Sequence, residues 1–153
     1  MKYSIPGQDE LEIKTIILDL NGTLAVGGII PEGVKDRINH LKGRGFQILF
    51  FTGNTRNDAD ELAADLQIDW KLAKSADEKR EAALMLGPES CASIGNGLID
   101  LELMRTVKLR IVTLQAEGIH VQTLINSDIV VPTILDALDL FIDEQRLIAT
   151  LRK

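Results

Sequence analysis

The stretch Lys14-Thr-Ile-Ile-Leu-Asp-Leu-Asn-Gly-Thr-Leu24 decides the fold. Its first half is a run of β-branched and apolar residues, which is typical of a strand buried on both faces of a parallel sheet. Asp19 ends that run, and Gly22 follows, a residue type that allows a tight left-handed turn. A carboxylate at the end of a buried strand is unfavourable unless it binds something, usually a cation or a phosphoryl group. Taken alone, the pattern equally fits a carboxylate that only caps the turn.

Strands and helices alternate along the rest of the chain. The sequence predicts strands over 46–51, 70–73, 91–94, 109–114 and 129–131, and helices over 31–43, 55–66, 77–86, 97–107, about 118–125 and 133–150. A hairpin is expected to pair residues 2–5 with 11–14 around the turn at Pro6-Gly7. This alternation indicates βαβ units, and therefore an α/β fold with a parallel sheet between two layers of helices. We expect one domain over residues 1–153, with the hairpin in 1–14 leading into the core.

Polar residues follow several of these strands, at the sheet edge where α/β proteins bind ligands. Thr52-Gly53 offers a hydroxyl and a backbone N–H that can contact phosphate oxygens, although it also fits an ordinary turn. Lys79 lies on a predicted helix, where a lone lysine is usually only solvated. Asn96 and Asp100 lie four residues apart after another strand, within reach of one metal site. Each signal is weak alone, so their combination and order carry the inference.

Composition limits the kind of partner. The formal net charge of −6 makes the chain a poor general binder of nucleic acid or anionic membranes. Cys91 is the only cysteine, so the sequence allows neither an intramolecular disulfide nor a zinc site of the Cys/His type. The N-terminal residues are too polar for a signal peptide, and no apolar run approaches a membrane span. We therefore expect a soluble, cytoplasmic protein.

The ordered pattern Asp-x-x-Gly-Thr-Leu, apolar-Thr-Gly, Lys and Gly-x-Gly-x-x-Asp resembles the four motifs of the haloacid dehalogenase (HAD) superfamily. The resemblance spans about residues 12–152 and implies a three-layer, Rossmann-like HAD core. It is similar in particular to soluble relatives of the P-type ATPase phosphorylation domain. Thr52-Gly53 matches the Thr-Gly-Asp of those pumps, and Gly95-Asn-Gly-Leu-Ile-Asp100 resembles their Gly-Asp-Gly-x-Asn-Asp.

This resemblance implies a role for each motif residue. Asp19 would attack phosphorus and carry an aspartyl-phosphate, and Mg²⁺ would be the cofactor. The implied cation ligands are the side chains of Asp19, Asn96 and Asp100 and the backbone carbonyl of Asn21. The implied phosphate-binding residues are Thr52, Gly53 and Lys79. With Asp19 as nucleophile, the implied catalytic set is Asp19, Asn21, Thr52 and Lys79, which act by positioning and electrostatics.

Asparagine stands at three positions, 21, 54 and 96, where the superfamily commonly has aspartate. Position 21 matters most, because phosphatases of this type use a second aspartate there as general acid/base, and an amide cannot transfer a proton. That assistance is typically worth ~10² to 10⁴ in rate. Asn96 would offer Mg²⁺ an oxygen with one negative charge fewer. We therefore expect weak phosphatase activity and weak Mg²⁺ binding.

The motif spacing leaves no room for a cap domain. Thr52 follows Asp19 by 33 positions, and Lys79 follows Thr52 by 27, which strands, helices and a short flap at 25–30 use up. The expected site is therefore open, so it would accept a phosphate on a large, even macromolecular, substrate, unless a second copy of the chain closes it. No transmembrane segment or nucleotide-binding insertion is present, which excludes ion pumping.

Two functions of different classes remain after sequence analysis. The first is a weak, capless, Mg²⁺-dependent phosphohydrolase, and the second is a non-catalytic or barely catalytic HAD-fold module for binding or regulation. A phosphoacceptor receiver domain also has an aspartate at a strand end, but Gly-Thr-Leu after Asp19 and the Gly-x-Gly-x-x-Asp motif argue against it. A dinucleotide-binding domain would need Gly-x-Gly-x-x-Gly after its first strand, and that motif is absent there.

Overall fold

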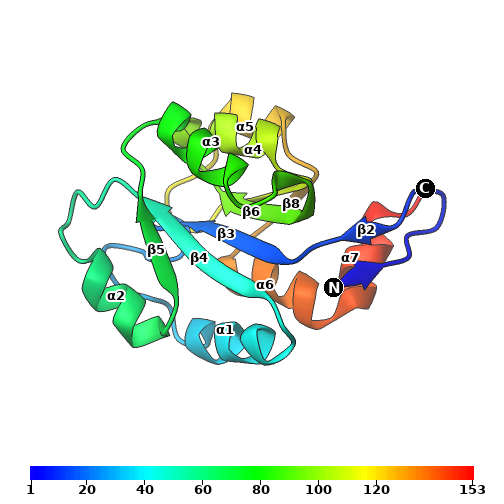
Figure 1. The fold of residues 1–153 in the computed structure, drawn as a ribbon, viewed down its shortest axis with the longest axis horizontal. Helices are drawn as coiled ribbons and strands as arrows, with labels where there is room; N and C mark the ends of the chain where they lie inside the picture. The colour runs from blue at the N-terminus through cyan, green and yellow to red at the C-terminus, as the bar shows by residue number, and fades with distance from the viewer.

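Six parallel strands form the central sheet of the computed structural model, which describes all residues 1–153 (Figure 1). The strands are β3 Thr15–Asp19, β4 Gln47–Thr52, β5 Asp69–Leu72, β6 Cys91–Gly95, β7 Leu109–Thr113 and β8 Ile129–Val131. Their order across the sheet is β5-β4-β3-β6-β7-β8. The chain therefore adds strands outward from β3 on one side and then from β6 on the other. This reversal makes the gap between β3 and β6 a topological switch point, the usual ligand site of such sheets.

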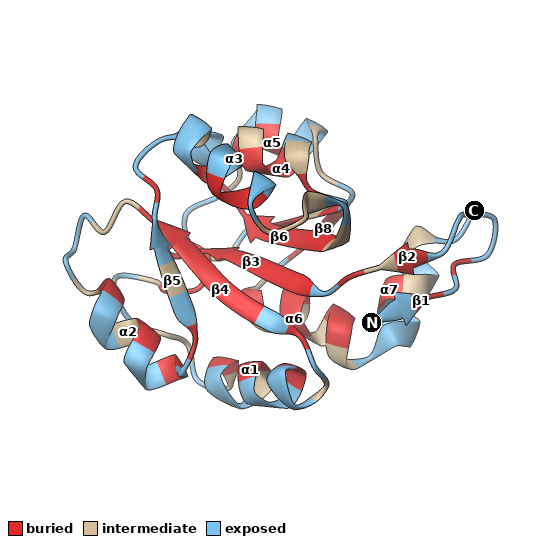
Figure 2. Cartoon of the chain, viewed as in Figure 1, coloured by how far each residue is buried: buried red, intermediate tan, exposed pale blue.

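Helices cover both faces of the sheet (Figure 1). One layer contains α1 Val34–Gly43, α2 Ala59–Leu66, α6 Ile134–Ile142 and α7 Glu144–Leu151, and the other contains α3 Ala76–Leu84, α4 Leu101–Thr106 and α5 Val121–Ile125. The inner strands β3, β4, β6 and β7 are almost wholly buried between these layers, whereas the edge strand β5 is largely exposed (Figure 2). In β3, Ile16 and Leu18 pack into one hydrophobic cluster and Ile17 into the other, as the two-residue period of a strand requires. The predicted three-layer α/β/α fold is confirmed.

The N-terminal hairpin exists but is short. β1 Lys2–Tyr3 pairs antiparallel with β2 Leu11–Glu12, and Lys2 lies opposite Glu12. The hairpin lies beside α7, away from the carboxyl ends of the sheet strands (Figure 1). Its buried residues belong to the same hydrophobic cluster as Leu147 of α7. This hairpin therefore extends the core at the far end of the sheet.

Two predicted helix starts were wrong. Helix α1 begins at Val34 rather than Pro31, because Gly33 takes a left-handed conformation with φ of 89°. Helix α2 begins at Ala59 rather than Thr55, because the preceding loop turns through Asn54 and Asn57, both at positive φ.

The predicted helix at 133–150 is two helices. Asp143 leaves the helical conformation and accepts a hydrogen bond from the Gln145 amide, which starts α7. The predicted helix at 97–107 divides similarly into a 3₁₀ turn, η2 Leu98–Asp100, followed by α4. A second 3₁₀ turn, η1 Pro88–Ser90, precedes β6.

Cys91 opens β6 and is fully buried. Burial raises the pKa of its thiol to about 11, against a smaller lowering by Thr15. A thiol needs its thiolate form to react, so Cys91 is a packing residue. No helix of the structure is long and apolar enough to span a membrane.

Candidate active site

Asp19 ends β3 at the switch point of the sheet, and its side chain is nearly buried. The next strand in space on one side is β4, whose last residue is Thr52, and on the other is β6, which leads into Asn96. Sheet pairing therefore brings the first, second and fourth sequence motifs to one edge. The predicted meeting of these residues at the carboxyl ends of the strands is what the structure shows.

Lys79 reaches this edge from α3 and is buried, with 1% of its side chain exposed. Its Nζ atom donates to Asp19 Oδ1 at 2.6 Å and to Asp100 Oδ1 at 2.7 Å. The ammonium thus bridges two carboxylates, one at the end of β3 and one in the turn that follows β6. A buried cation between two anions has a fixed position, so Lys79 is not the solvated helical lysine that a single-residue reading would favour.

The charges of this triad do not cancel. Two carboxylates share one ammonium, and burial together with the charge of Asp100 raises the pKa of Asp19 to about 7, against the lowering effect of Lys79. Burial opposes the charge of Lys79, but the two carboxylates outweigh it and raise the pKa of that amine. At neutral pH a proton on Asp19 therefore partly offsets the second negative charge, and a bound cation would replace that proton.

Asp100 is held by the turn that follows β6. Its Oδ2 atom accepts hydrogen bonds from the amides of Asn96 and Gly97, both at 3.1 Å. A side chain on Gly95 would collide with it, because an added Cβ would lie 2.6 Å from Oδ2. Both oxygens of Asp100 are thus engaged within the protein, one by the turn and one by Lys79.

The amide of Asn96 lies between two loops. Its Oδ1 atom accepts from the Thr23 hydroxyl at 3.3 Å, and its Nδ2 atom donates to the Gly118 carbonyl at 2.9 Å. The backbone carbonyl of Asn21 accepts no hydrogen bond, although it lies in the turn directly after β3. A carboxylate, an amide oxygen and a free carbonyl oxygen near one edge form a hard, all-oxygen donor set, which suits Mg²⁺.

No three His, Cys, Asp or Glu side chains gather closely enough to hold a metal ion. The predicted ligands include only two such side chains, Asp19 and Asp100, so this finding leaves that prediction untested. The chemistry of the donors fits a weakly held hard cation better than a tightly held transition metal, because no soft ligand is present.

Thr52 is buried at the end of β4, where its hydroxyl oxygen accepts from the Asn54 amide at 3.0 Å. That bond leaves the hydroxyl proton free to donate. Asn54 in turn accepts from the Ala59 amide at 3.1 Å through its side-chain oxygen, which fixes the loop that starts α2. Gly53 lies between them, with only ordinary contacts around its α-carbon. The loop therefore presents one hydroxyl donor and backbone amides beside Asp19.

The flap predicted at 25–30 is a tight two-residue hairpin. Val26 and Ile29 exchange two backbone hydrogen bonds of 2.9 and 3.0 Å, and Gly27 and Gly28 make the turn at positive φ. Arg56, from the loop after β4, donates to the Gly27 carbonyl at 3.0 Å. The flap is therefore hydrogen-bonded to the same loop that carries Thr52-Gly53.

Sequence reasoning missed three residues at this edge. Thr23 lies inside the first motif, and its hydroxyl contact with Asn96 could have been suspected from that position. Arg56 and Glu117 lie in loops without a motif, and each approaches a glycine of the turn or flap after β3. Such contacts between loops depend on tertiary packing, so no local sequence pattern predicts them.

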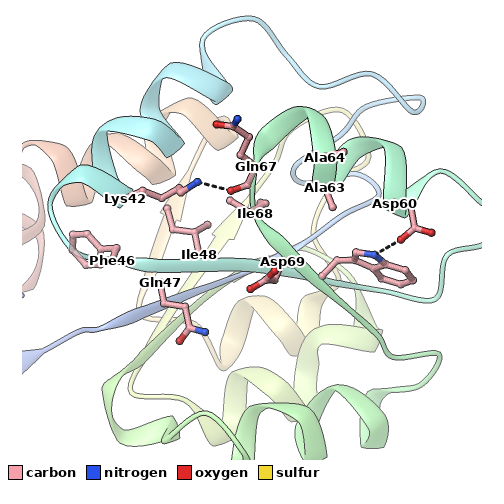
Figure 3. A pocket seen from close by; sticks show the side chains of 11 residues that line it. Lys42, Phe46, Gln47, Ile48, Asp60, Ala63, Ala64, Gln67, Ile68 and Asp69 are labelled. Carbon is pink, nitrogen blue, oxygen red and sulfur yellow. Dashed lines mark hydrogen bonds between the residues drawn. The ribbon is translucent and has the colours of Figure 1, made fainter.

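The largest cavity lies elsewhere. It measures about 550 Å³ and opens between α1, α2 and the first residues of β4 and β5 (Figure 3). Trp70 donates to Asp60 at 2.8 Å across it, and Lys42 donates to the Gln67 carbonyl. None of the predicted site residues lines this cavity, so we place the candidate site by its chemistry.

Comparison with solved structures identifies the fold. A putative 3-deoxy-D-manno-octulosonate 8-phosphate phosphatase from Vibrio cholerae superposes with a TM-score of 0.72, over 95% of this chain and 96% of that one, at 19% identity. The corresponding phosphatase from Moraxella catarrhalis, solved with magnesium, phosphate and KDO, gives 0.69 over 92% and 94%, at 23% identity. Both belong to the HAD hydrolases. This chain has the HAD fold.

The HAD resemblance extends to other solved structures but says little about activity. A phosphoserine phosphatase in apo form matches with a TM-score of 0.68, over 86% of this chain and 99% of that one, at 14% identity. At these identities the likeness establishes the HAD fold alone. The narrower resemblance to P-type ATPase phosphorylation domains stays a prediction.

Sequence comparison finds two uncharacterized proteins of Methanocaldococcus jannaschii. One is 47% identical over 60 residues, which is 39% of this chain and 64% of the relative. The other is 62% identical over 29 residues, which is 19% of this chain and 66% of the relative. The matches thus span just under two thirds of each relative's length. No family model matches the chain.

Proposed function

We propose that the chain is a slow, Mg²⁺-dependent phosphohydrolase of the HAD type that forms an aspartyl-phosphate on Asp19. The observation that carries this proposal is the bridge from buried Lys79 to Asp19 and Asp100 at the switch point of the sheet. Lys79 donates a hydrogen bond to Asp19 Oδ1, and no side chain donates to the second oxygen of this carboxylate. That free oxygen is available as the nucleophile.

In the proposed reaction Asp19 is the nucleophile, and the other site residues bind the phosphoryl group or orient Asp19. An oxygen of Asp19 forms a bond to phosphorus as the bond to the ester oxygen breaks, and the leaving oxygen takes a proton from water. The Thr52 hydroxyl and the Gly53 amide donate to the transferring phosphoryl oxygens. Lys79 orients Asp19 and offsets the accumulating negative charge. Water then attacks phosphorus, the Asp19–phosphorus bond breaks, and inorganic phosphate leaves.

Asp19, the Asn21 carbonyl and Asn96 would hold the Mg²⁺ ion. When bound, the ion supplies positive charge that counters the phosphoryl oxygens and the excess charge of the triad. Asp100 was predicted as a further ligand. One oxygen of Asp100 is held by the Lys79 ammonium and the other by two backbone amides, whereas Asn96 Oδ1 accepts only one long bond from Thr23. We therefore propose that Asp100 serves instead by fixing Lys79 and the turn that carries Asn96.

The side chain at position 21 is the reason that we propose a low rate of phosphate release. Its amide cannot protonate the leaving oxygen or accept a proton from attacking water, so both half-reactions depend on solvent. The same feature favours the second candidate, a HAD-fold module that binds a phosphorylated ligand and hardly turns it over.

We further propose an open, capless site. Between β3 and α1 the chain has only the short flap at 25–30, which is hydrogen-bonded to the loop after β4 and is too small to be a cap domain. Phosphate groups on large substrates would therefore reach Asp19, and a second copy of the chain could complete the closure for small ones.

Phosphate release from an aryl phosphate, measured with Mg²⁺ and with EDTA, tests the proposal. We expect slow, Mg²⁺-dependent release that Asp19→Asn abolishes and that Asp9→Asn, the same chemical change in the exposed hairpin, leaves unaltered. Release that survives Asp19→Asn would exclude Asp19 as nucleophile. Absence of release, together with retained binding of Mg²⁺ and BeF₃⁻, would favour the binding module.

A further inference from the structure

The loop between β7 and α5, residues 114–120, brings an additional carboxylate to the rim of the site. Glu117 is exposed, and its carboxylate takes part in none of the ion pairs of the protein. Its negative charge therefore has no counter-charge within the protein.

Glu117 lies against the turn that follows Asp19. A side-chain carbon added to Gly22 would overlap the Glu117 carboxylate and would lie 3.1 Å from the Glu117 Cγ atom. Gly22 directly follows Asn21, whose carbonyl oxygen accepts no hydrogen bond. The unpartnered carboxylate thus lies next to the peptide unit that we propose as a cation ligand.

The same loop is attached to the other side of the cation site. The Asn96 side chain donates to the carbonyl of Gly118 at 2.9 Å, and the His120 amide donates to the Asn96 carbonyl at 2.8 Å. The Gly118 amide also donates to the Leu114 carbonyl, which closes the loop into a turn. The loop that carries Glu117 is therefore hydrogen-bonded to the turn after β6, while the Glu117 carboxylate lies against the turn after β3. Both of these turns carry proposed ligands.

The other proposed ligands of the cation carry little negative charge. Asn21 and Asn96 contribute neutral oxygens, and Asp19 shares its charge with Lys79. The affinity of an oxygen site for a hard divalent cation depends strongly on how many ligands are charged. One more carboxylate at the rim would restore the charge that an asparagine at position 96 lacks.

We propose that Glu117 is a ligand of the divalent cation, directly or through one bound water, and that it replaces the charge missing at Asn96. This inference rests on the proposed function, because it uses the same cation site. It assigns the loop after β7 to the site, which none of the four sequence motifs does.

Calorimetric titration of the full chain with Mn²⁺ and with Mg²⁺, without substrate, tests the inference. We expect Glu117→Gln to weaken binding by about tenfold or more, the effect typical of groups that support a metal. Glu117→Asp, which keeps the charge on a shorter side chain, should bind with intermediate affinity. The matched control is Glu144→Gln, an equal loss of charge at the exposed start of α7, far from the strand ends (Figure 1), and it should change affinity less than twofold.

Asp19→Asn separates the two proposals. If it abolishes binding while Glu117→Gln binds like the unaltered chain, the inference about Glu117 is wrong and the cation site stands. If neither substitution changes the affinity, the cation binds elsewhere and both proposals are wrong. Glu117 is exposed on a loop, so Gln is compatible with folding, and urea denaturation in EDTA verifies this for each variant.

Discussion

Asp100 holds Lys79 at 2.7 Å, and each of the two side chains is 1% exposed. The contact joins the turn after β6 to the middle of α3, and the same Lys79 ammonium also donates to Asp19. Because the bridge consists of the protein's own buried side chains, it holds the ammonium beside Asp19, the residue that we propose as the nucleophile. Preorganised charge of this kind is the main contribution that a protein makes to phosphoryl transfer.

Lys79→Met should be strongly destabilising. It removes the counter-charge of two buried carboxylates, and breaking a buried ion pair in this way costs about 3–5 kcal/mol. Urea denaturation at pH 8 in EDTA measures the loss. The triple variant Asp19→Asn, Lys79→Met, Asp100→Asn has no buried charge and should recover much of the stability. A Lys79→Met protein as stable as the unaltered chain would show that the bridge contributes nothing to folding.

The stability of the metal-free protein should fall as pH rises from about 4 to about 7. The pKa of Asp19 is about 7 in the folded protein and ordinarily 3.8, so in this window the folded state binds more protons than the unfolded state. Asp19→Asn removes this titration. Thermal melts in EDTA should therefore show the variant gaining stability over the unaltered chain as pH rises. An equal difference at pH 4.5 and pH 7.5 would contradict the raised pKa.

Gly95→Ala should disturb the site, whereas Gly97→Ala should not. A methyl group on Gly95 would lie 2.6 Å from the Asp100 carboxylate, whereas on Gly97 its nearest neighbour would be 3.6 Å away. Displacing Asp100 loosens Lys79, so we expect a loss of about 1–3 kcal/mol in stability, as for other overpacked sites, and a lower rate of phosphate release. Urea denaturation and the aryl phosphate assay measure both effects. Equal effects of the two substitutions would mean that Asp100 can move without consequence.

Asn21→Asp should raise turnover by up to ~10², because it restores a group that can transfer a proton. Fresh protein must be compared by intact mass, since Asn21-Gly22 and Asn96-Gly97 are sequences prone to deamidation. If unmodified protein already turns over as fast as the Asn21→Asp variant, Asn21 does not limit the rate.

Asn96→Asp should mainly tighten Mg²⁺ binding, although it also loses the hydrogen bond to the Gly118 carbonyl.

The sequence predicted the sheet well because buried parallel strands consist of continuous apolar runs. The run that ends at Asp19 is such a strand, and β8 has the predicted bounds. Helix ends were less predictable, because they depend on single residues whose backbone conformation the sequence does not determine. Gly33 delays α1 by its left-handed conformation, and Asp143 divides the last predicted helix by capping α7.

The site was predictable only as far as its motifs extend. Asp19, Thr52, Lys79 and Asp100 were all named from sequence, and the structure brings them or their backbones to one edge. The burial of Lys79 was not predictable, because a mostly polar helix gives no sign that one lysine points inward. Glu117 was missed for a related reason, since its contact with Gly22 joins loops 95 residues apart.

The burial of Cys91 makes it possible to label the flap at a single introduced thiol. The chain has no other thiol, and this one is fully buried with a raised pKa, so maleimide reagents should leave the folded protein unlabelled. Ile29, at the end of the flap turn, is 73% exposed. An Ile29→Cys variant would therefore carry one reactive thiol on the flap, and a fluorophore attached there would report whether the flap moves when a phosphate ligand binds.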